Sequence, residues 1–357
     1  MTRNEINPTE VEAFARRLTD ALNGAGLALM ISVGHQTGLF DRLAELPPST
    51  SEQIARAAGL QERYVREWLG AMVTGGIIEA DRERQTYRLP PERGACLTRA
   101  AGPASMAALM QLVPLIGNVE DRIVACFRDG GGVPYSAYPR FHALMAELTE
   151  LDHDASLIDG ILPMAAGLIE RLREGADVAD IGCGHGHSVN LLARAFPASR
   201  FTGYDIAADA LEQGRAEAMR WGLTNVRFVE QDVAALDLDG VYDAITAFDA
   251  IHDQARPRAA LRSIHRALRP GSTFLMADIA AASAITDNVG HPLAPFLYTL
   301  STMHCMTVSL ADGGEGLGAM WGEEQARVLL AEAGFTLQAV KRLESDALNS
   351  YFIAIRP

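Results

Sequence analysis

Short apolar runs alternate with helical patterns along the second half of the chain. Seven runs rich in β-branched and aromatic residues predict strands, and apolar positions at helical spacing fill most of the intervals between them. The predicted strands are Val178–Ile181, Arg200–Tyr204, Val226–Glu230, Tyr242–Phe248, Ser272–Asp278, Thr336–Arg342 and Ser350–Ile355. Strands that alternate with helices build a doubly wound α/β sheet, whereas the last two strands here follow each other without a helix. The pattern therefore predicts a seven-stranded α/β fold that differs from the six-stranded dinucleotide fold.

The first half of the chain predicts mostly helices. Val11, Phe14, Leu18 and Leu22 recur at helical spacing and predict an amphipathic helix over residues 9–30. A helix, a turn, a second helix and a β-hairpin follow, which is the order of a winged helix-turn-helix. These elements are a helix over Glu52–Ala58 with Ser49 or Ser51 as its N-cap, a helix over Gln61–Thr74, and strands over Ile77–Ala80 and Thr86–Leu89.

Charge decides how this winged module is interpreted. Residues 51–90 contain six arginines and six acidic residues, and the formal net charge of the whole chain is −14. A module that binds DNA needs a positive excess, because phosphate contacts supply most of the affinity. We therefore expect the winged helix to serve dimerisation and expect no nucleic-acid partner.

Composition describes a globular protein of two or more domains. The chain has 357 residues, of which 48% are hydrophobic and 21% are charged. No apolar run reaches the length of a membrane span, and the start MTRNEINPTE lacks the apolar core of a signal peptide. The four cysteines stand far apart without CxxC spacing, which is typical of a reducing compartment. We expect a cytoplasmic location and no membrane partner.

Three segments are expected in this chain. Residues 1–95 form the winged-helix and dimerisation domain, residues 96–170 a helical linker and substrate lid, and residues 171–357 the α/β domain with a helical insertion at about 284–320. Within the linker, the glycine-rich break at residues 130–135 predicts either a mobile lid or a packed connection. Residues 157–172 predict one amphipathic helix that leads into the first strand.

The segment VADIGCGHGHS, from Val178 to Ser188, predicts a nucleotide-binding turn between a strand and a helix. Gly182, Gly184 and Gly186 let the backbone approach a ligand closely. Asp205 follows the second predicted strand, 19 positions after Gly186, where a carboxylate can accept hydrogen bonds from both ribose hydroxyls. Alternatively, Asp205 is the N-cap of a helix over Ala207–Arg215. This much agrees with either a nicotinamide cofactor or S-adenosylmethionine.

Two further motifs distinguish these cofactors. Asp232 follows the third strand, where its carboxylate can accept from an adenine amine while the backbone N–H of Val233 reaches the ring. With the glycine loop, Asp205 and the segment at the end of the fourth strand, this order resembles a class I S-adenosylmethionine-dependent methyltransferase over residues 175–357. The resemblance implies S-adenosylmethionine as cofactor and S-adenosylhomocysteine as product. It also implies cofactor contacts by Asp180, Ile206 and Phe248, with Asp180 near the ammonium group.

The whole chain resembles a bacterial methyltransferase family with an N-terminal winged helix of the mycobacterial Rv2258c-like type. The resemblance is carried by the winged module at residues 30–89, by the segments 133–142 and 248–254, and by residues 292–306 with 320–322. It implies a homodimer and a small-molecule acceptor enclosed by helical insertions. It does not imply a particular acceptor.

His252 and Asp253 are the candidate catalytic residues. The segment Ile251-His-Asp253 resembles the part of small-molecule O-methyltransferases in which histidine is the general base that removes the proton of the acceptor hydroxyl. The chain differs from that family at residues 254–256, where Gln-Ala-Arg stands in place of a tryptophan and an acid, so the orienting partner of the histidine is open. Alternatively, His252 lines the cofactor pocket or caps the next helix.

The acceptor pocket is predicted from aromatic, methionine and histidine side chains in the linker and the insertion. Its residues are Tyr135, Tyr138, His142, Phe296, Met303, His304 and Trp321. Their apolar character favours a hydrophobic or aromatic acceptor, and the same residues could instead pack as core. We expect no metal, because neighbouring helical residues such as His304 and Cys305 point about 100° apart and no third ligand is evident.

Two other functions remain compatible with the sequence. The winged helix allows a transcriptional regulator that senses a ligand through a methyltransferase-like domain. The glycine loop allows an NAD-dependent oxidoreductase, although it lacks the G-x-G-x-x-G spacing. Methyl transfer to oxygen is favoured by His252, whereas transfer to nitrogen or sulfur would not require that base.

Overall fold

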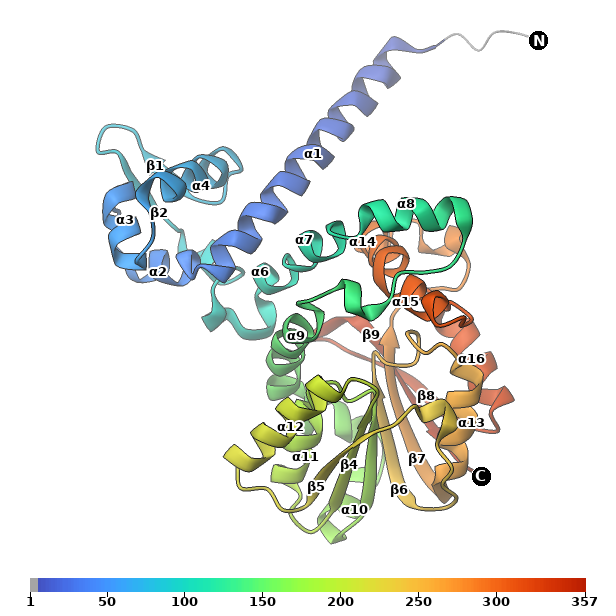
Figure 1. Ribbon diagram of the computed structural model, residues 1–357. Helices are drawn as coiled ribbons and strands as arrows, with labels where there is room; N and C mark the ends of the chain where they lie inside the picture. Colours follow the sequence, from blue (N-terminus) through green and yellow to red (C-terminus); the bar gives the residue numbers. More distant parts are fainter. Residues whose placement is uncertain (1–5) are drawn as a thin grey trace, which may run out of the picture. The chain divides into compact units, whose positions relative to one another are not determined.

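The computed structural model describes residues 6–357 and divides into two compact units, Met1–Leu115 and Ile116–Pro357 (Figure 1). Residues 1–5, on which the expectation about a signal peptide partly depends, lie outside the described residues. Among residues 6–357, no helix combines the length and the apolar composition that a membrane crossing requires. The predicted segment borders at residues 95 and 170 stay predictions.

The first unit contains the predicted winged helix-turn-helix. Its long first helix begins after Asn7, whose side chain accepts a hydrogen bond from the Thr9 N–H. The elements of the unit are α1 (Pro8–Gln36), α2 (Leu39–Glu45), α3 (Ser51–Ala58), α4 (Glu62–Thr74), β1 (Glu79–Asp81), β2 (Thr86–Arg88), α5 (Pro91–Gly94), η1 (Arg99–Ala104), α6 (Met106–Leu109) and the start of α7 (Leu112–Gly117). Phe40, Ile54, Leu69 and Met72 fill its core.

The N-cap of α3 differs from the prediction. Thr50, rather than Ser49 or Ser51, caps the helix: its hydroxyl accepts from the Gln53 N–H, and the Gln53 side chain accepts from the Thr50 N–H. This reciprocal pair satisfies two backbone donors at once. The two serines have other partners, because Ser49 donates to the Pro47 carbonyl and Ser51 donates to Glu62.

The second unit is built on a mixed sheet of seven strands in the order β5-β4-β3-β6-β7-β9-β8. The strands are β3 (Asp177–Ile181), β4 (Arg200–Asp205), β5 (Val226–Glu230), β6 (Tyr242–Phe248), β7 (Leu268–Ile279), β8 (Thr336–Leu343) and β9 (Asp346–Ile355). All seven predicted strands are present. The first five run parallel, and β9 pairs antiparallel with both β7 and β8. This arrangement confirms the seven-stranded α/β prediction and differs from an open six-stranded parallel sheet.

Helices cover both faces of this sheet and create two apolar layers (Figure 1). On one face lie α10 (Leu168–Glu174), α11 (His187–Ala195) and α12 (Ala208–Arg220), whose Leu172, Val189 and Leu211 pack against the strands. On the other face lie α13 (Pro257–Ala267) and α16 (Gly322–Glu332), which contribute Leu261 and Leu330. This double burial explains why the strands read as continuous apolar runs.

Further helices precede the sheet, lie between β5 and β6, or are inserted after β7. They are α8 (Glu120–Asp129), η2 (Tyr135–Ala137), α9 (Phe141–Ser156), η3 (Leu157–Ile161), η4 (Leu162–Met164), η5 (Val233–Ala235), η6 (Ile285–Asn288), α14 (Ala294–Leu300), η7 (Ser301–Cys305) and α15 (Met306–Ala311). The prediction of one helix over residues 157–172 was wrong. The segment breaks into a π turn, a 3₁₀ turn and α10, because Pro163 lacks a backbone donor and Gly167 adopts a φ of 76°.

Candidate functional site

The glycine loop lies at the carboxyl ends of the parallel strands, where α/β sheets bind their ligands. It joins β3 to α11, and its glycines all have positive φ. A Cβ atom on Gly186 would lie 2.1 Å from the Phe228 ring, so this position excludes any side chain. A Cβ atom on Gly184 would meet nothing within 4 Å. The loop is therefore packed on one side and open at Gly184, as a ligand cradle requires.

Asp205 connects the end of β4 to this loop. Its Oδ2 accepts from the Gly184 N–H at 2.8 Å, and its Oδ1 accepts from the Ala207 N–H at 2.8 Å. A carboxylate offers about four lone-pair positions, so both oxygens retain acceptor capacity for a ligand. The next side chain, Ile206, is 59% exposed, which leaves an apolar surface beside the carboxylate.

Asp180 and Asp232 occupy different surroundings. Asp180 is buried in β3, where its Oδ1 accepts from the Thr246 hydroxyl at 2.5 Å, and burial raises the pKa of this carboxyl to about 7. Asp232 caps η5 by accepting from the Ala234 N–H at 2.8 Å and forms an ion pair with Arg256. Asp232 is thus positioned at the end of β5, but part of its carboxylate is already engaged.

Phe248 ends β6 beside the same edge of the sheet. Its ring packs against His153 of α9 in an edge-to-face contact with a centroid distance of 4.8 Å. The Nδ1 atom of His153 lies 2.6 Å from the hydroxyl of Ser188 in α11. Phe248, α9 and the helix after the glycine loop therefore contact one another.

His252 is held between two carboxylates. Its Nδ1 lies 2.7 Å from Oδ1 of Asp278, and its Nε2 lies 3.4 Å from Oδ1 of Asp253. Trp321 donates its indole N–H to the same Asp278 oxygen at 2.9 Å. Burial disfavours the charged imidazolium, but Asp278 and Asp253 outweigh it and raise the pKa of His252 well above its ordinary value.

Asp278 is the carboxylate in contact with Nδ1 of His252, whose partner the sequence left open. It was predicted only as the last residue of a strand, and β7 pairs in parallel with β6, which precedes His252. The carboxyl ends of neighbouring parallel strands meet at one edge of a sheet. An acidic residue at the end of the predicted strand Ser272–Asp278 was therefore the sequence signal that could have identified this partner of His252. Trp321 was predicted to line the acceptor pocket; it is buried in the core and reaches the site through Asp278.

Asp253 connects His252 to the linker segment. Its Oδ2 accepts from the Tyr135 hydroxyl at 2.9 Å, while its Oδ1 is buried and has no hydrogen-bond partner among the described residues. Cys305 lies beside both residues, with ligand atoms of His252, Asp253 and Cys305 within 4.8 Å of one another. Burial raises the pKa of the Cys305 thiol to about 12, so this side chain is a neutral thiol.

Aromatic rings enclose His304. The ring of Phe141 stacks on the imidazole with a centroid distance of 3.7 Å. Tyr138 and Tyr135 approach edge-on, with centroid distances of 4.8 and 5.2 Å. The imidazole is fully buried, and neither of its nitrogens has a hydrogen-bond partner within residues 6–357. Burial lowers the pKa of His304 to about 4, so the ring is neutral. We call Tyr135, Tyr138, Phe141 and His304 the aromatic cage.

The other predicted pocket residues are distributed unevenly. The ring centroid of His142 lies 6.0 Å from that of Tyr135 and 6.3 Å from that of His185 in the glycine loop. Met303 packs in the same apolar cluster as Tyr138. Phe296 belongs to a separate cluster with Leu297 and Met320. The cage residue Phe141 was missed, because its stacking on His304 joins segments more than 160 positions apart.

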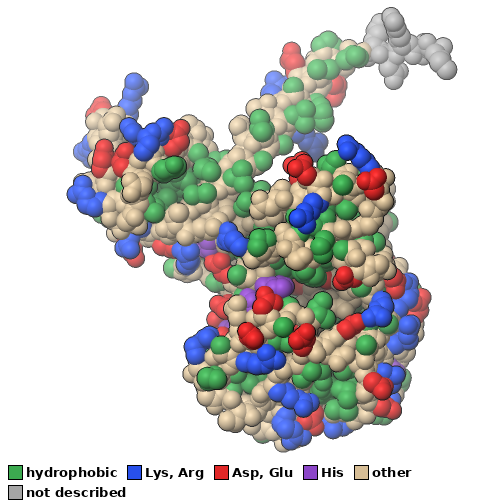
Figure 2. Space-filling view, in the orientation of Figure 1, with side chains coloured by type: hydrophobic (Ala, Val, Ile, Leu, Met, Phe, Trp, Pro, Cys, Tyr) green, Lys and Arg blue, Asp and Glu red, His purple; other side chains and the backbone are tan. Residues whose placement is uncertain are grey.

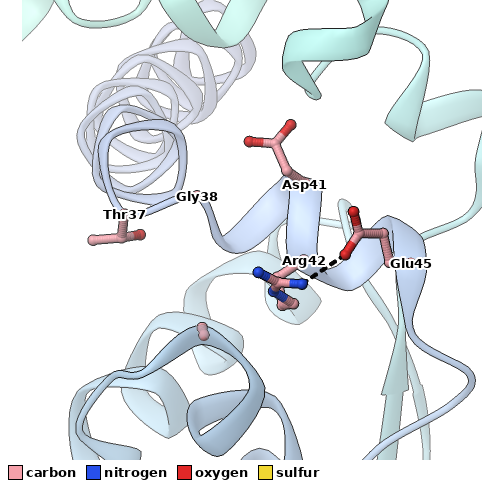
Figure 3. A pocket seen from close by; sticks show the side chains of 6 residues that line it. Thr37, Gly38, Asp41, Arg42 and Glu45 are labelled. Atoms are coloured by element: carbon pink, nitrogen blue, oxygen red, sulfur yellow. Dashed lines mark hydrogen bonds and ion pairs between the residues drawn. The ribbon is translucent and has the colours of Figure 1, made fainter.

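A small hollow of about 240 Å³ lies in the first unit (Figure 3). Thr37, Gly38, Asp41, Arg42 and Glu45 line it, and an Arg42–Glu45 ion pair of 2.7 Å lies within it. Its lining is polar and includes the carboxylates of Asp41 and Glu45, but it contains no histidine. We assign it no part in the chemistry.

Comparisons with known proteins match both parts of the chain to families. Residues 25–99 match the family model described as "Rv2258c-like winged HTH domain", and residues 172–318 match one described as "Methyltransferase domain". A fatty-acid O-methyltransferase of Mycolicibacterium smegmatis is 34% identical over 106 residues, which cover 29% of this chain and 38% of that protein. This relative and two others are matched over only 38%, 55% and 37% of their own length.

Proteins that match over nearly the whole chain have lower sequence identity. The N,N-dimethyltransferase OxyT of Streptomyces rimosus is 24% identical, with 100% of each chain covered. The structure of human N-acetylserotonin methyltransferase in complex with S-adenosylmethionine superposes with a TM-score of 0.70 at 18% identity, covering 99% of each chain. At this identity the structural match establishes the fold and leaves the acceptor open.

Proposed function

We propose that this chain, which joins an Rv2258c-like winged helix-turn-helix domain to a class I methyltransferase domain, transfers a methyl group from S-adenosylmethionine to an oxygen of a small organic acceptor. The observation that carries the proposal is the buried His252–Asp278 pair at the cofactor edge of the sheet. A histidine oriented by a carboxylate is the arrangement by which enzymes remove a hydroxyl proton.

The residues of the glycine loop fit the cofactor that the fold implies. Gly184 has open space where a Cβ would stand, Asp205 retains acceptor positions for ribose hydroxyls, and Ile206 offers an apolar surface. Buried Asp180 supplies a carboxyl at the base of the loop for the ammonium group. Asp232 and the backbone of Val233 complete the set at the end of β5, with Phe248 at the end of β6. When bound, S-adenosylmethionine supplies an electrophilic methyl group.

His252 removes the acceptor proton in this proposal. Asp278 holds Nδ1, which leaves Nε2 to take the proton of the acceptor hydroxyl, so that the oxygen would become nucleophilic toward the methyl group that the cofactor would supply. Trp321 fixes the orientation of Asp278 through its indole N–H. Oδ1 of Asp253 makes no hydrogen bond among the described residues and lies 3.4 Å from Nε2, where it can position the hydroxyl.

The aromatic cage supports a hydrophobic or aromatic acceptor. Tyr135 links the cage to Asp253 through a hydrogen bond, so a molecule bound against the cage lies close to His252. Neutral His304 is fully buried between these rings, and its two nitrogens without partners among the described residues are polar groups beside this apolar surface. His142 and Met303 lie next to the cage, whereas Phe296 belongs to a separate cluster.

Dimerisation through the first unit is part of the proposal. Val11, Phe14, Leu18 and Leu22 form an apolar stripe on α1 and are between 53% and 74% exposed. Figure 2 shows hydrophobic side chains spaced along this helix. Such a stripe on a long helix is unusual for a monomer, and pairing with a second copy would bury it.

The regulator alternative has less support. Arginines of the winged module pair with neighbouring acids, as in Arg63–Glu67, Arg66–Glu62 and Arg88–Glu79. Figure 2 shows both charges interspersed on this part of the surface rather than a basic patch. Phosphate binding would have to compete with these ion pairs. We also propose a cytoplasmic location, which the four free cysteines support.

A methyl-transfer assay tests the proposal. Purified protein, S-adenosylmethionine with a labelled methyl group and a panel of phenols, carboxylic acids and amines should yield labelled product with oxygen acceptors. His252→Ala should lower that rate by about 100-fold or more. Turnover of amines alone, unaffected by His252→Ala, would contradict transfer to oxygen.

A further inference from the structure

A second cluster of ionisable side chains lies outside the His252 site, where α9, α11 and α12 pack together. His187 is the first residue of α11, and Glu217 lies in the last turn of α12. Their side chains are only 7% and 11% exposed. Glu150 and Asp154, four positions apart on one face of α9, complete the cluster from the solvent side.

The imidazole of His187 faces a carboxylate on each side. Its Nδ1 lies 3.0 Å from Oε1 of Glu217, and its Nε2 lies 3.3 Å from Oδ1 of Asp154. One ligand atom each from Glu150, His187 and Glu217 falls within 4.8 Å of the other two. Three side chains at this spacing can share one cation, because metal–nitrogen and metal–oxygen bonds are about 2.0–2.2 Å long.

The side chains that contact these residues are arranged like those that orient the ligands of a metal site. Histidine ligands usually donate their second ring N–H to a carboxylate, and Asp154 stands at that position. Asn190 donates to Oε2 of Glu217 at 2.9 Å, which leaves Oε1 directed at the imidazole. The carbonyl oxygen of the same amide is fully buried and has no partner among the described residues.

Carboxylates outnumber imidazoles in this cluster. Glu150, Asp154 and Glu217 bring three carboxylates around a single imidazole. A mixed set of nitrogen and oxygen ligands suits Zn²⁺ or Mn²⁺, whereas Mg²⁺ prefers oxygen ligands alone. We propose that Glu150, His187 and Glu217 bind a divalent transition-metal cation, with Asp154 and Asn190 orienting the ligands.

Such a cation would connect three helices that surround the cofactor edge. α9 carries Phe141 of the aromatic cage at its start and His153, which contacts Phe248 and Ser188, near its end. α11 follows the glycine loop directly. A bound cation would therefore fix the helix that bears part of the cage to the helix that follows the cofactor loop. This site does not depend on methyl transfer, since none of its ligands takes part in the proposed chemistry.

Calorimetric titration of tag-free, EDTA-treated full-length protein with Zn²⁺ and Mn²⁺ tests the site. We expect one cation per chain, tighter for Zn²⁺ than for Mn²⁺, and no comparable binding of Mg²⁺. Glu150→Gln removes an exposed ligand without disturbing the core and should weaken binding at least tenfold. Glu217→Gln, which keeps the side-chain volume, should do the same. Glu212→Gln, on an exposed position of α12, is the matched control and should bind like the original chain.

Among residues 6–357, two other clusters lie at the His252 site, and Cys305→Ser separates the proposed site from the one that contains the cysteine. A cation held by Asp249, His252 and Asp278 would bind unchanged in Glu150→Gln. His252, Asp253 and Cys305 also lie within ligand distance of one another, so a cation bound there would depend on the cysteine. The proposal predicts that Cys305→Ser binds the cation as before. Saturable binding that is lost in Cys305→Ser, or that is unchanged in Glu150→Gln, would overturn it, as would the absence of binding by the folded original protein.

Discussion

Nδ1 of His252 lies 2.7 Å from Oδ1 of Asp278, and both side chains are buried although the residues are 26 positions apart. The pair exists because β6 and β7 run in parallel and end at the same edge of the sheet. A carboxylate at this distance fixes the orientation of the imidazole and favours its protonated form.

The pH dependence of turnover should report this pair. Asp278, Asp253, Cys305 and Asp249 face His252. Burial opposes the charged imidazolium, but Asp278 and Asp253 raise the pKa of His252 well above the ordinary value. A general base must be unprotonated, so the rate should rise with pH and reach its midpoint above the ordinary histidine value of about 6.5. Asp278→Asn should move the midpoint down by about one pH unit. A midpoint that stays in place would exclude Asp278 as the orienting residue.

Cofactor binding and turnover should separate in two variants. Asp205→Ala removes the carboxylate that joins β4 to the Gly184 N–H and should weaken cofactor binding at least tenfold. His252→Ala should leave the dissociation constant of the cofactor within about twofold and lower turnover. If His252→Ala abolished cofactor binding, its assignment as general base would lose its support.

The buried nitrogens of His304 should lower the free energy of unfolding when no acceptor is bound. Both of its nitrogens are buried without partners among the described residues, and such groups cost about 1–3 kcal/mol each. His304→Phe keeps the stacking on Phe141 and should raise the free energy of unfolding by about 1 kcal/mol while lowering turnover. Tyr138→Phe is a useful comparison, since it loses a hydrogen bond to the Met303 carbonyl and should be destabilising. Equal loss of stability in both variants would contradict the unsatisfied state of His304.

The apolar stripe on α1 should control the oligomeric state. Leu18→Asp places a charge in the middle of the stripe and should shift a dimer to a monomer in light scattering at micromolar concentration. Arg17→Asp changes the charge of the neighbouring exposed position and should leave the dimer intact. A monomer in the original chain, or a dimer in both variants, would exclude pairing through this stripe.

The strands and the glycine loop could be predicted because their signals are local. Apolar runs that are buried on both sheet faces stand out at any position, and the loop needs glycine where Phe228 leaves no space. The broken helix at residues 157–172 was missed because its apolar spacing continues across Pro163. The Thr50 cap was missed because three neighbouring hydroxyl residues gave the same local signal.

The candidate site was predictable only in part. His252 and Asp205 follow strands and could be found from order alone, whereas Asp278 and Phe141 gain their places through contacts between distant segments. Spacing also could not reveal the cluster of Glu150, His187 and Glu217, whose members come from three separate helices. Contacts of this kind depend on how the helices pack, which periodicity does not specify.

Isothermal titration with S-adenosylmethionine and S-adenosylhomocysteine tests whether the chain binds the methyl donor and its product. We expect the folded protein to bind both with dissociation constants in about the micromolar range, and Asp205→Ala to lose this binding while remaining folded. Folded protein that binds neither compound would contradict a methyltransferase function and would leave the winged-helix regulator as the function to test.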